Sequence, residues 1–187
     1  MQKKYETNRV TRELVTIAVM SALAVASRVA FMAVPHFKPM VGIIMITGMA
    51  FGVKAGFITG AMSAFVSNFF FGQGPWTLFQ MASYGVAGVI AALAKKYELI
   101  DCENRLFSAI FGFATVVFVV GPILDTSTFV MVMNVVNMET VATVYLAGLP
   151  VNVKHGIATA ITLLVLGKPM IRKLERMKIK YGIFFKK

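Results

Sequence analysis

Six long apolar runs, separated by short breaks that are basic or rich in glycine and proline, fill this chain of 187 residues. The run from Leu14 to Phe31 contains a single charged residue. A core helix of a soluble protein alternates apolar and polar faces, whereas a helix that crosses a bilayer needs about 20 mainly apolar residues. With 58% hydrophobic residues, the chain is expected to fold within a lipid bilayer.

The predicted fold class is an all-α integral membrane protein, a bundle of six transmembrane helices that forms one domain over residues 1–187. Six crossings with short connections leave no room for a separate soluble domain. The predicted spans lie near residues 13–34, 40–53, 55–71, 76–94, 106–124 and 148–167.

The basic residues indicate how the bundle is oriented. Of the 19 Lys and Arg residues, eight lie in the first inner segments and eight more between Lys168 and Lys187; the first eight are Lys3, Lys4, Arg9, Arg12, Lys54, Lys95, Lys96 and Arg105. Short cytoplasmic loops carry such an excess, so both termini are expected in the cytoplasm. Because these charges gather at the ends of the apolar runs, the net charge of +11 does not indicate nucleic-acid binding.

Residues 125–147 are apolar enough for a seventh span, but they include Glu139, Asn134 and Asn137. A seventh crossing would also place the basic tail outside. We therefore expect an outer loop here, with room for a helix that lies in the membrane interface.

Small residues recur every four positions in the first span, at Ala18, Ala22 and Ala26. Such a stripe lets a second helix approach closely. This matters in a bilayer because lipid provides no hydrophobic driving force, so helices associate through close packing contacts. Two interpretations remain open at this point: packing inside the chain's own bundle, or a docking face for a separate membrane subunit.

The motifs that would indicate an enzyme are absent from the sequence. It contains no phosphate-binding G-x-x-x-x-G-K-[ST], no H-E-x-x-H and no G-x-S-x-G, and its single cysteine, Cys102, cannot form a zinc site. We expect no enzymatic activity, no metal site and no intrinsic cofactor, and any energy from ATP must come from another chain.

Arg28 lies deep inside the first span, about 15 residues from its inner edge, on the face opposite the alanine stripe. An arginine at this depth faces the bundle interior, where Asp125 or an anionic ligand group can satisfy it. The alternatives are an arginine that extends to the membrane surface, or a structural pair with Asp125 without a ligand.

The other candidate substrate-binding residues lie near the predicted outer ends of the spans. Gln80 and Tyr84 share one helix face and can line a cavity together. Trp76 alone is more often a membrane anchor than a ligand contact. Lys154 and His155 form either a positive rim for the ligand or ordinary interfacial residues. The full set also includes Phe37, Lys38, Asn68, Gln73, Asn134 and Asn137.

Several stretches resemble a known family. The runs 37–40, 48–52 and 67–77, the last containing Gly74-Pro75-Trp76, together with Gln80-Met81, are similar to the substrate-binding S-components of energy-coupling factor (ECF) vitamin transporters. Within that family they resemble the subgroup for cobalamin or its precursors.

This resemblance implies a substrate-binding subunit of the bacterial plasma membrane that captures a vitamin, expected to be cobalamin or a related precursor. Its implied partners are a transmembrane coupling protein and two cytoplasmic ATPases. Ala18, Ala22 and Ala26 match the family's coupling motif, which favours the docking-face interpretation. The alternatives are an S-component for another vitamin, a stand-alone secondary transporter, or an assembly protein without an outer cavity.

Overall fold

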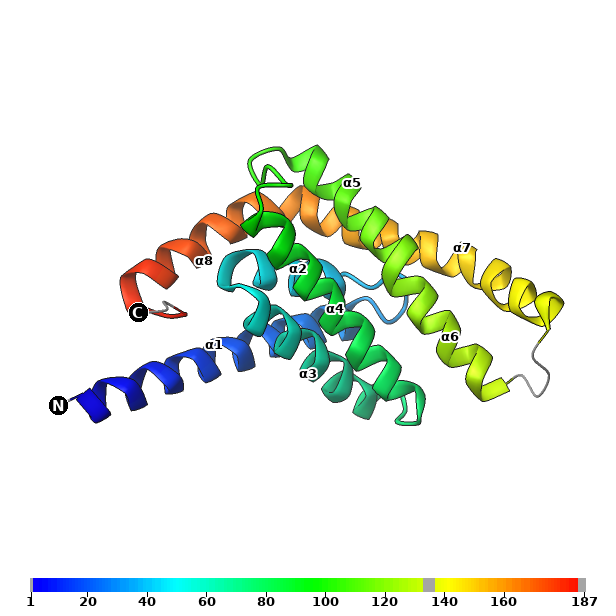
Figure 1. Cartoon of the computed structure of the whole chain (residues 1–187), viewed down its shortest axis with the longest axis horizontal. Helices are drawn as coiled ribbons and strands as arrows, with labels where there is room; N and C mark the ends of the chain where they lie inside the picture. Colours follow the sequence, from blue (N-terminus) through cyan, green and yellow to red (C-terminus); the bar gives the residue numbers. More distant parts are fainter. Residues whose placement is uncertain (1, 133–136, 185–187) are drawn as a thin grey trace.

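The computed structural model of the chain describes residues 2–132 and 137–184, and the regular elements in these ranges are all helices (Figure 1). In chain order they are α1 (Gln2–Ala30), α2 (Met40–Phe51), α3 (Val53–Phe71), α4 (Trp76–Lys96), α5 (Arg105–Thr115), α6 (Gly121–Val132), α7 (Met138–Thr162) and α8 (Lys168–Tyr181). Two π-helical turns, η1 (Val116–Val120) and η2 (Leu163–Gly167), join α5 to α6 and α7 to α8. The described helices therefore form six rods, and the predicted all-α membrane fold is confirmed.

Four of these rods are long and apolar enough to cross a membrane, namely Arg9–Ala30, Trp76–Lys96, Arg105–Met131 and Met138–Tyr181. α2 differs from them, because it has only 12 residues and all of them are buried. At 1.5 Å per residue, α2 spans about 18 Å, less than the roughly 30 Å of a bilayer core. It is the central core helix, in contact with α1, α3, α4, α7 and α8.

The segment expected as an outer loop, residues 125–147, is largely helical: α6 continues to Val132 and α7 begins at Met138. A capping box starts α7 early, because the side chain of Asn137 accepts a bond from the Thr140 N–H at 2.8 Å and Thr140 Oγ1 accepts one from the Asn137 N–H at 3.2 Å. Pro122 does not end the rod, since the π-helical turn directly before it shifts the hydrogen-bond register where proline lacks a donor.

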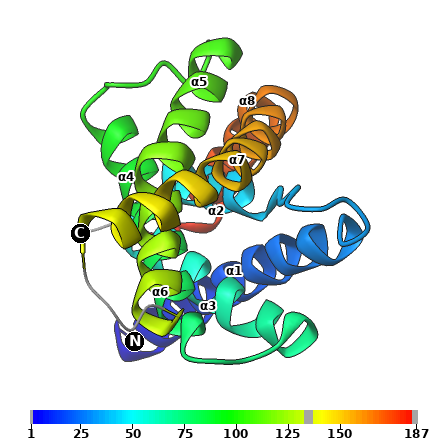
Figure 2. The same cartoon turned by 90° about the vertical axis from the view of Figure 1, so that its right-hand side faces the viewer.

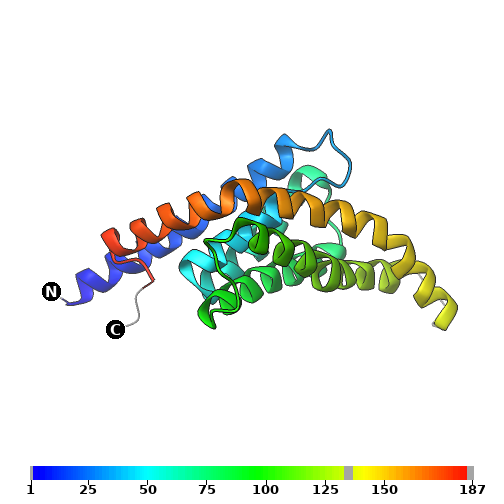
Figure 3. The same cartoon turned by 90° about the horizontal axis from the view of Figure 1, so that it is seen from above.

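α1 begins and α8 ends at the same end of the bundle (Figures 1 and 3). We call this the cytoplasmic end, after the basic residues expected there, and the opposite one the outer end. Figure 2 looks onto the outer end, where α1, α3 and α6 finish and α7 starts.

The backbone of α4 lies in direct contact with those of α2 and α3. Gly88 lies against the backbone of Gly48 and Gly56, and a methyl group added to Gly56 would lie 2.7 Å from the Gly88 carbonyl oxygen. One face of α3 continues this contact, because a side chain at Gly60 would collide with the carbonyl of Tyr84. Close approach of this kind requires glycine and fixes the position of Tyr84.

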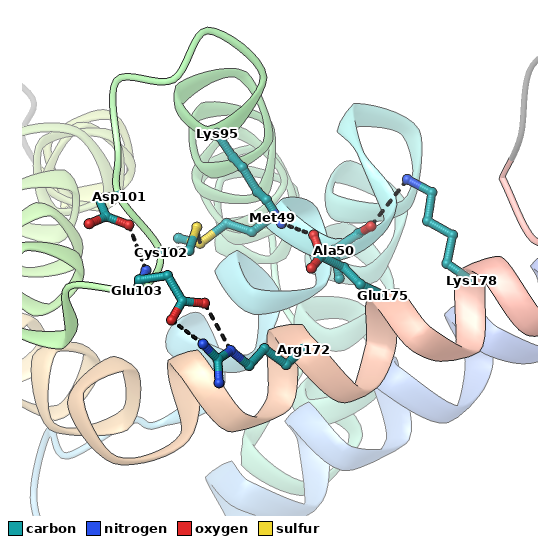
Figure 4. A network of polar contacts seen from close by, with 9 residues as sticks. All are labelled: Met49, Ala50, Lys95, Asp101, Cys102, Glu103, Arg172, Glu175 and Lys178. Carbon is teal, nitrogen blue, oxygen red and sulfur yellow. Dashed lines mark hydrogen bonds and ion pairs between the residues drawn. The ribbon is translucent and has the colours of Figure 1, made fainter.

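Charged side chains close the cytoplasmic end, where residues 97–104 meet α8 (Figure 4). The Glu103 carboxylate accepts a hydrogen bond from Arg172 Nε at 2.8 Å and pairs with Lys168 Nζ at 2.8 Å. The bonds from Arg172 and Lys168 lower the pKa of Glu103 to about 2. Lys95 forms a second ion pair with Glu175. The polar groups drawn at this end therefore have partners within the chain.

Candidate functional site

Three buried polar atoms toward the outer end have no hydrogen-bond partner among the described residues: Gln80 Oε1 and the Tyr84 hydroxyl on α4, and His155 Nε2 on α7. We call these residues the unpaired cluster. Tyr84 is fully buried and His155 is 2% exposed, and their rings meet edge to face with centroids 6.0 Å apart. An unmade hydrogen bond at a buried group costs about 1–3 kcal/mol. The arrangement is therefore suited to a ligand that supplies the missing partners.

Asp125 lies on α6 and faces α7. Its carboxylate accepts a hydrogen bond from Asn152 Nδ2 at 2.7 Å and packs against Gly148. Among the described residues Asp125 therefore pairs with an amide, and the structural pair between Arg28 and Asp125, one of the alternatives considered, is not formed. Asn152 is buried three residues before His155, so it lies on the same side of α7 as the unpaired cluster.

Arg28 is buried near the end of α1, as its position inside an apolar run predicted. Its Nη1 donates to Ser67 Oγ at 2.5 Å and to Asn68 Oδ1 at 3.1 Å on α3. The guanidinium also lies over the ring of Phe71, 4.4 Å from the centroid. Among the described residues, the partners of the guanidinium are therefore polar and aromatic groups and include no carboxylate.

From Asn68 the hydrogen bonds continue into the turn between α3 and α4. Asn68 Nδ2 donates to Thr77 Oγ1 at 2.9 Å, and that hydroxyl donates to Gln73 Oε1 at 2.9 Å. Gln73 Nε2 in turn donates to the carbonyl of Phe65 at 3.0 Å. Gln73 and Asn68, both candidate substrate-binding residues, therefore build the outer turn.

A cavity of about 330 Å³ opens where α1 ends. We call it the outer cavity; its lining consists of Arg28, Phe31, Met32, Val34, Pro35, His36, Phe37, Lys38 and Phe71. It includes two predicted site residues, Phe37 and Lys38.

The remaining candidate substrate-binding residues that the structure describes lie outside both the unpaired cluster and the outer cavity. The indole of Trp76 covers Gly74 in the outer turn and is 40% exposed, and Lys154 is exposed on α7. Asn137 is the N-cap of α7. Asn134 lies outside the described residues.

The alanine stripe of α1 lies on the surface. Ala18, Ala22 and Ala26 are exposed, and Arg28 points the other way into the bundle. An apolar groove of about 480 Å³ runs beside the stripe between α1 and α3, and its lining consists of Leu14, Ile17, Ala18, Ser21, Ala22, Val25, Ile58, Met62 and Val66. Within this groove the Ser21 hydroxyl is buried and has no partner among the described residues.

Sequence reasoning missed three residues that the structure brings into the polar interior. Ser67 and Phe71 hold Arg28, and Asn152 holds Asp125. Asn152 had a detectable signal, because an amide three positions before His155 in an apolar run shares its helix face. Ser67 and Phe71 had no such signal, because they lie on α3 and Arg28 lies on α1, which is distant in sequence.

Residues 8–172 match the model of the family described as ECF-type riboflavin transporter, S component. No curated protein and no solved structure matches the chain. The match corrects the expected subgroup, because assignment to cobalamin or its precursors, and cobalamin as the ligand, are wrong. The stretch that suggested cobalamin, Gly74-Pro75-Trp76, forms the outer turn with Gln73 and Thr77, a structural role that does not depend on the ligand.

The same match confirms the coarser predictions. An S-component is a transport subunit and not an enzyme, and it is a multi-pass protein of the bacterial membrane. Of the alternatives considered above, an S-component for another vitamin is better supported than the main prediction. With the match extending over most of its length, this chain belongs to the family of ECF-type riboflavin transporter S components.

Proposed function

We propose that the chain captures riboflavin at its outer end, as the substrate-binding subunit of an ATP-driven vitamin importer. The family membership supports the substrate class, and the unpaired cluster supports the location. The observation that carries the proposal is the presence, on α4 and α7, of three buried polar atoms without partners among the described residues, in a chain with no enzymatic motif.

The chemistry of riboflavin suits this cluster. Its flat ring system carries carbonyl oxygens, ring nitrogens and one N–H group, and its ribityl chain carries hydroxyl groups. Gln80 Oε1 is an acceptor for an N–H or hydroxyl, while the Tyr84 hydroxyl can donate or accept. The edge-to-face rings of Tyr84 and His155 offer an aromatic surface beside these polar atoms. Asn152, on the same side of α7 as His155, and its partner Asp125 on α6 extend the polar lining toward the ribityl chain.

The exposed stripe of α1 is the surface we assign to the coupling protein. Membership of the family implies an ECF module as partner. Ala18, Ala22 and Ala26 present a smooth face next to an open apolar groove, which suits close packing of a transmembrane helix. Two cytoplasmic ATPases supply the energy in this proposal, since the sequence has no phosphate-binding loop of its own.

Binding and uptake test this function separately. The purified chain in detergent is titrated into riboflavin, whose fluorescence reports binding, with cobalamin as the comparison ligand. We expect tight binding of riboflavin and none of cobalamin. Vesicles containing the chain alone should not accumulate riboflavin, whereas vesicles with the coupling protein and ATPases should do so when ATP is present. Absence of riboflavin binding, or accumulation by the chain alone, contradicts the proposal.

A further inference from the structure

We propose that the outer cavity binds a phosphate group. Three groups that are cationic or can become so line this cavity, namely Arg28, His36 and Lys38. No Asp or Glu is among the residues that line it, and none of the ion pairs between described residues includes any of the three. Positive charge gathered in one hollow without counter-charge raises the local concentration of anions.

Arg28 supplies the geometry that phosphate recognition requires. Both of its hydrogen bonds to described residues come from Nη1, which leaves Nε and Nη2 without a protein acceptor among them. The contact with Phe71, which also lines the cavity, holds the plane of the guanidinium. A planar guanidinium with free N–H groups binds the oxygens of a phosphate in a bidentate manner.

The segment between α1 and α2 holds the other two groups in place. The backbone N–H of Val34 bonds to the Phe31 carbonyl at 3.0 Å, and that of Phe37 bonds to the Val34 carbonyl at 3.2 Å. The rings of Phe31 and Phe37 pack with centroids 5.2 Å apart. His36 has a φ of 63°, a left-handed conformation that costs free energy in a non-glycine residue. The segment is therefore an ordered turn that presents His36 beside Lys38.

Two sources can supply a phosphate at this position. One is a phosphorylated flavin whose rings occupy the unpaired cluster; this source rests on the proposed function. The other is the headgroup of an anionic lipid in the outer leaflet, which needs no flavin. The same residues of this chain would hold the phosphate in both cases.

The first experiment compares riboflavin with riboflavin 5′-phosphate on the full chain in detergent. We expect the phosphate ester to bind more tightly, and its advantage over riboflavin to fall about tenfold in Lys38→Gln, which loses one charge-assisted hydrogen bond. Lys96→Gln, an exposed lysine at the cytoplasmic end, is the matched control and should keep the full ratio. Lys38 is used because Arg28 also supports the fold through Ser67 and Asn68.

The second experiment places the same variants in nanodiscs of phosphatidylcholine with or without phosphatidylglycerol. If the phosphate comes from lipid, phosphatidylglycerol raises the melting temperature of the unaltered chain and of Lys96→Gln but not of Lys38→Gln, and the two flavins bind alike. The proposal is overturned if Lys38→Gln changes neither the flavin ratio nor the lipid response. A chain that binds no flavin but shows the lipid response contradicts the proposed function while supporting the phosphate site.

Discussion

Two surfaces of this protein carry small residues at the same spacing and use them in opposite ways. On α3, Gly56 and Gly60 lie four positions apart and bring its backbone into direct contact with that of α4 inside the bundle. On α1, Ala18 and Ala22 have equivalent spacing and remain exposed beside an open groove. The spacing of small residues therefore indicates that a helix face permits close packing. The other residues of the helix determine whether that face packs inside the bundle or remains exposed. In α1, the burial of Arg28 on the opposite face turns the stripe outward.

The largest effect on stability is expected from a bulky residue in the backbone contact between α3 and α4, which we call the closed contact. Gly88→Leu places a side chain against the backbone of Gly56, which cannot move aside as a flexible side chain would. We expect a loss of about 3 kcal/mol or more in the free energy of unfolding, seen as a lower melting temperature and poor yield of folded protein. If this variant melts like the unaltered chain, the helices are not in backbone contact and the comparison fails.

The same substitution on the open surface should spare the fold and impair transport. Ala22→Leu adds its side chain at an exposed position, so the free energy of unfolding should change by only about 0.5 kcal/mol and riboflavin binding should persist. ATP-driven uptake in vesicles with the coupling module should fall about tenfold or more, because the helices can no longer approach closely. Equal losses of binding and uptake would place this stripe inside the substrate bundle instead.

A smaller effect, on riboflavin binding, is expected at Tyr84, which belongs to both the closed contact and the unpaired cluster. The backbone of Tyr84 is fixed against Gly60, while its hydroxyl is buried without a partner. Tyr84→Phe should weaken riboflavin binding by about three- to tenfold, the value of one hydrogen bond, without destabilising the empty protein.

Tyr97→Phe is the control for this variant, because Tyr97 is exposed at the cytoplasmic end. Fluorescence titration and melting curves measure both properties on the same samples. A Tyr84→Phe protein that is less stable when empty would mean that the hydroxyl has a partner within the chain.

The helices and the inward-facing polar residues were predictable from sequence because lipid imposes strong rules on both. A bilayer requires long apolar helices, and a polar side chain such as Gln80 or His155 must turn away from lipid. The structure places Tyr84 and His155 in contact, from helices far apart in the chain. The sequence did not predict which helices contact one another, because these contacts depend on the orientation of each helix about its own axis.

Local hydrogen bonding accounts for several polar residues that the sequence analysis considered for other roles. Asn137 was considered for substrate binding, yet its side chain caps α7 through a residue three positions later. The expected loop at 125–147 followed from the polar residues within it, although a capping box uses just such residues to start a helix. The assignment of cobalamin as the ligand, which the family match contradicts, rested on the Gly74-Pro75-Trp76 stretch, and that stretch forms a turn.

The smallest effect on stability is expected at the cytoplasmic end, where exposed ion pairs and not glycines join the chain segments. Glu103 joins residues 97–104 to α8 through Arg172 and Lys168, and its side chain is 51% exposed. Exposed ion pairs contribute little to stability in water. At pH 7 we therefore expect Glu103→Gln to melt within a few degrees of the unaltered chain, far above Gly88→Leu.

The pH dependence of this contact follows from the lowered pKa of Glu103, which is about 2 in the folded protein and roughly 4.3 in an unfolded chain. A lowered carboxyl pKa gives a stabilisation that is complete above the unfolded value and is lost as pH falls through the folded value. The small difference between Glu103→Gln and the unaltered chain should therefore be constant from pH 8 to roughly pH 5 and shrink below roughly pH 4. Melting curves across this range, with Glu98→Gln as a control outside the ion pairs, would contradict the assignment if the difference grew on acidification.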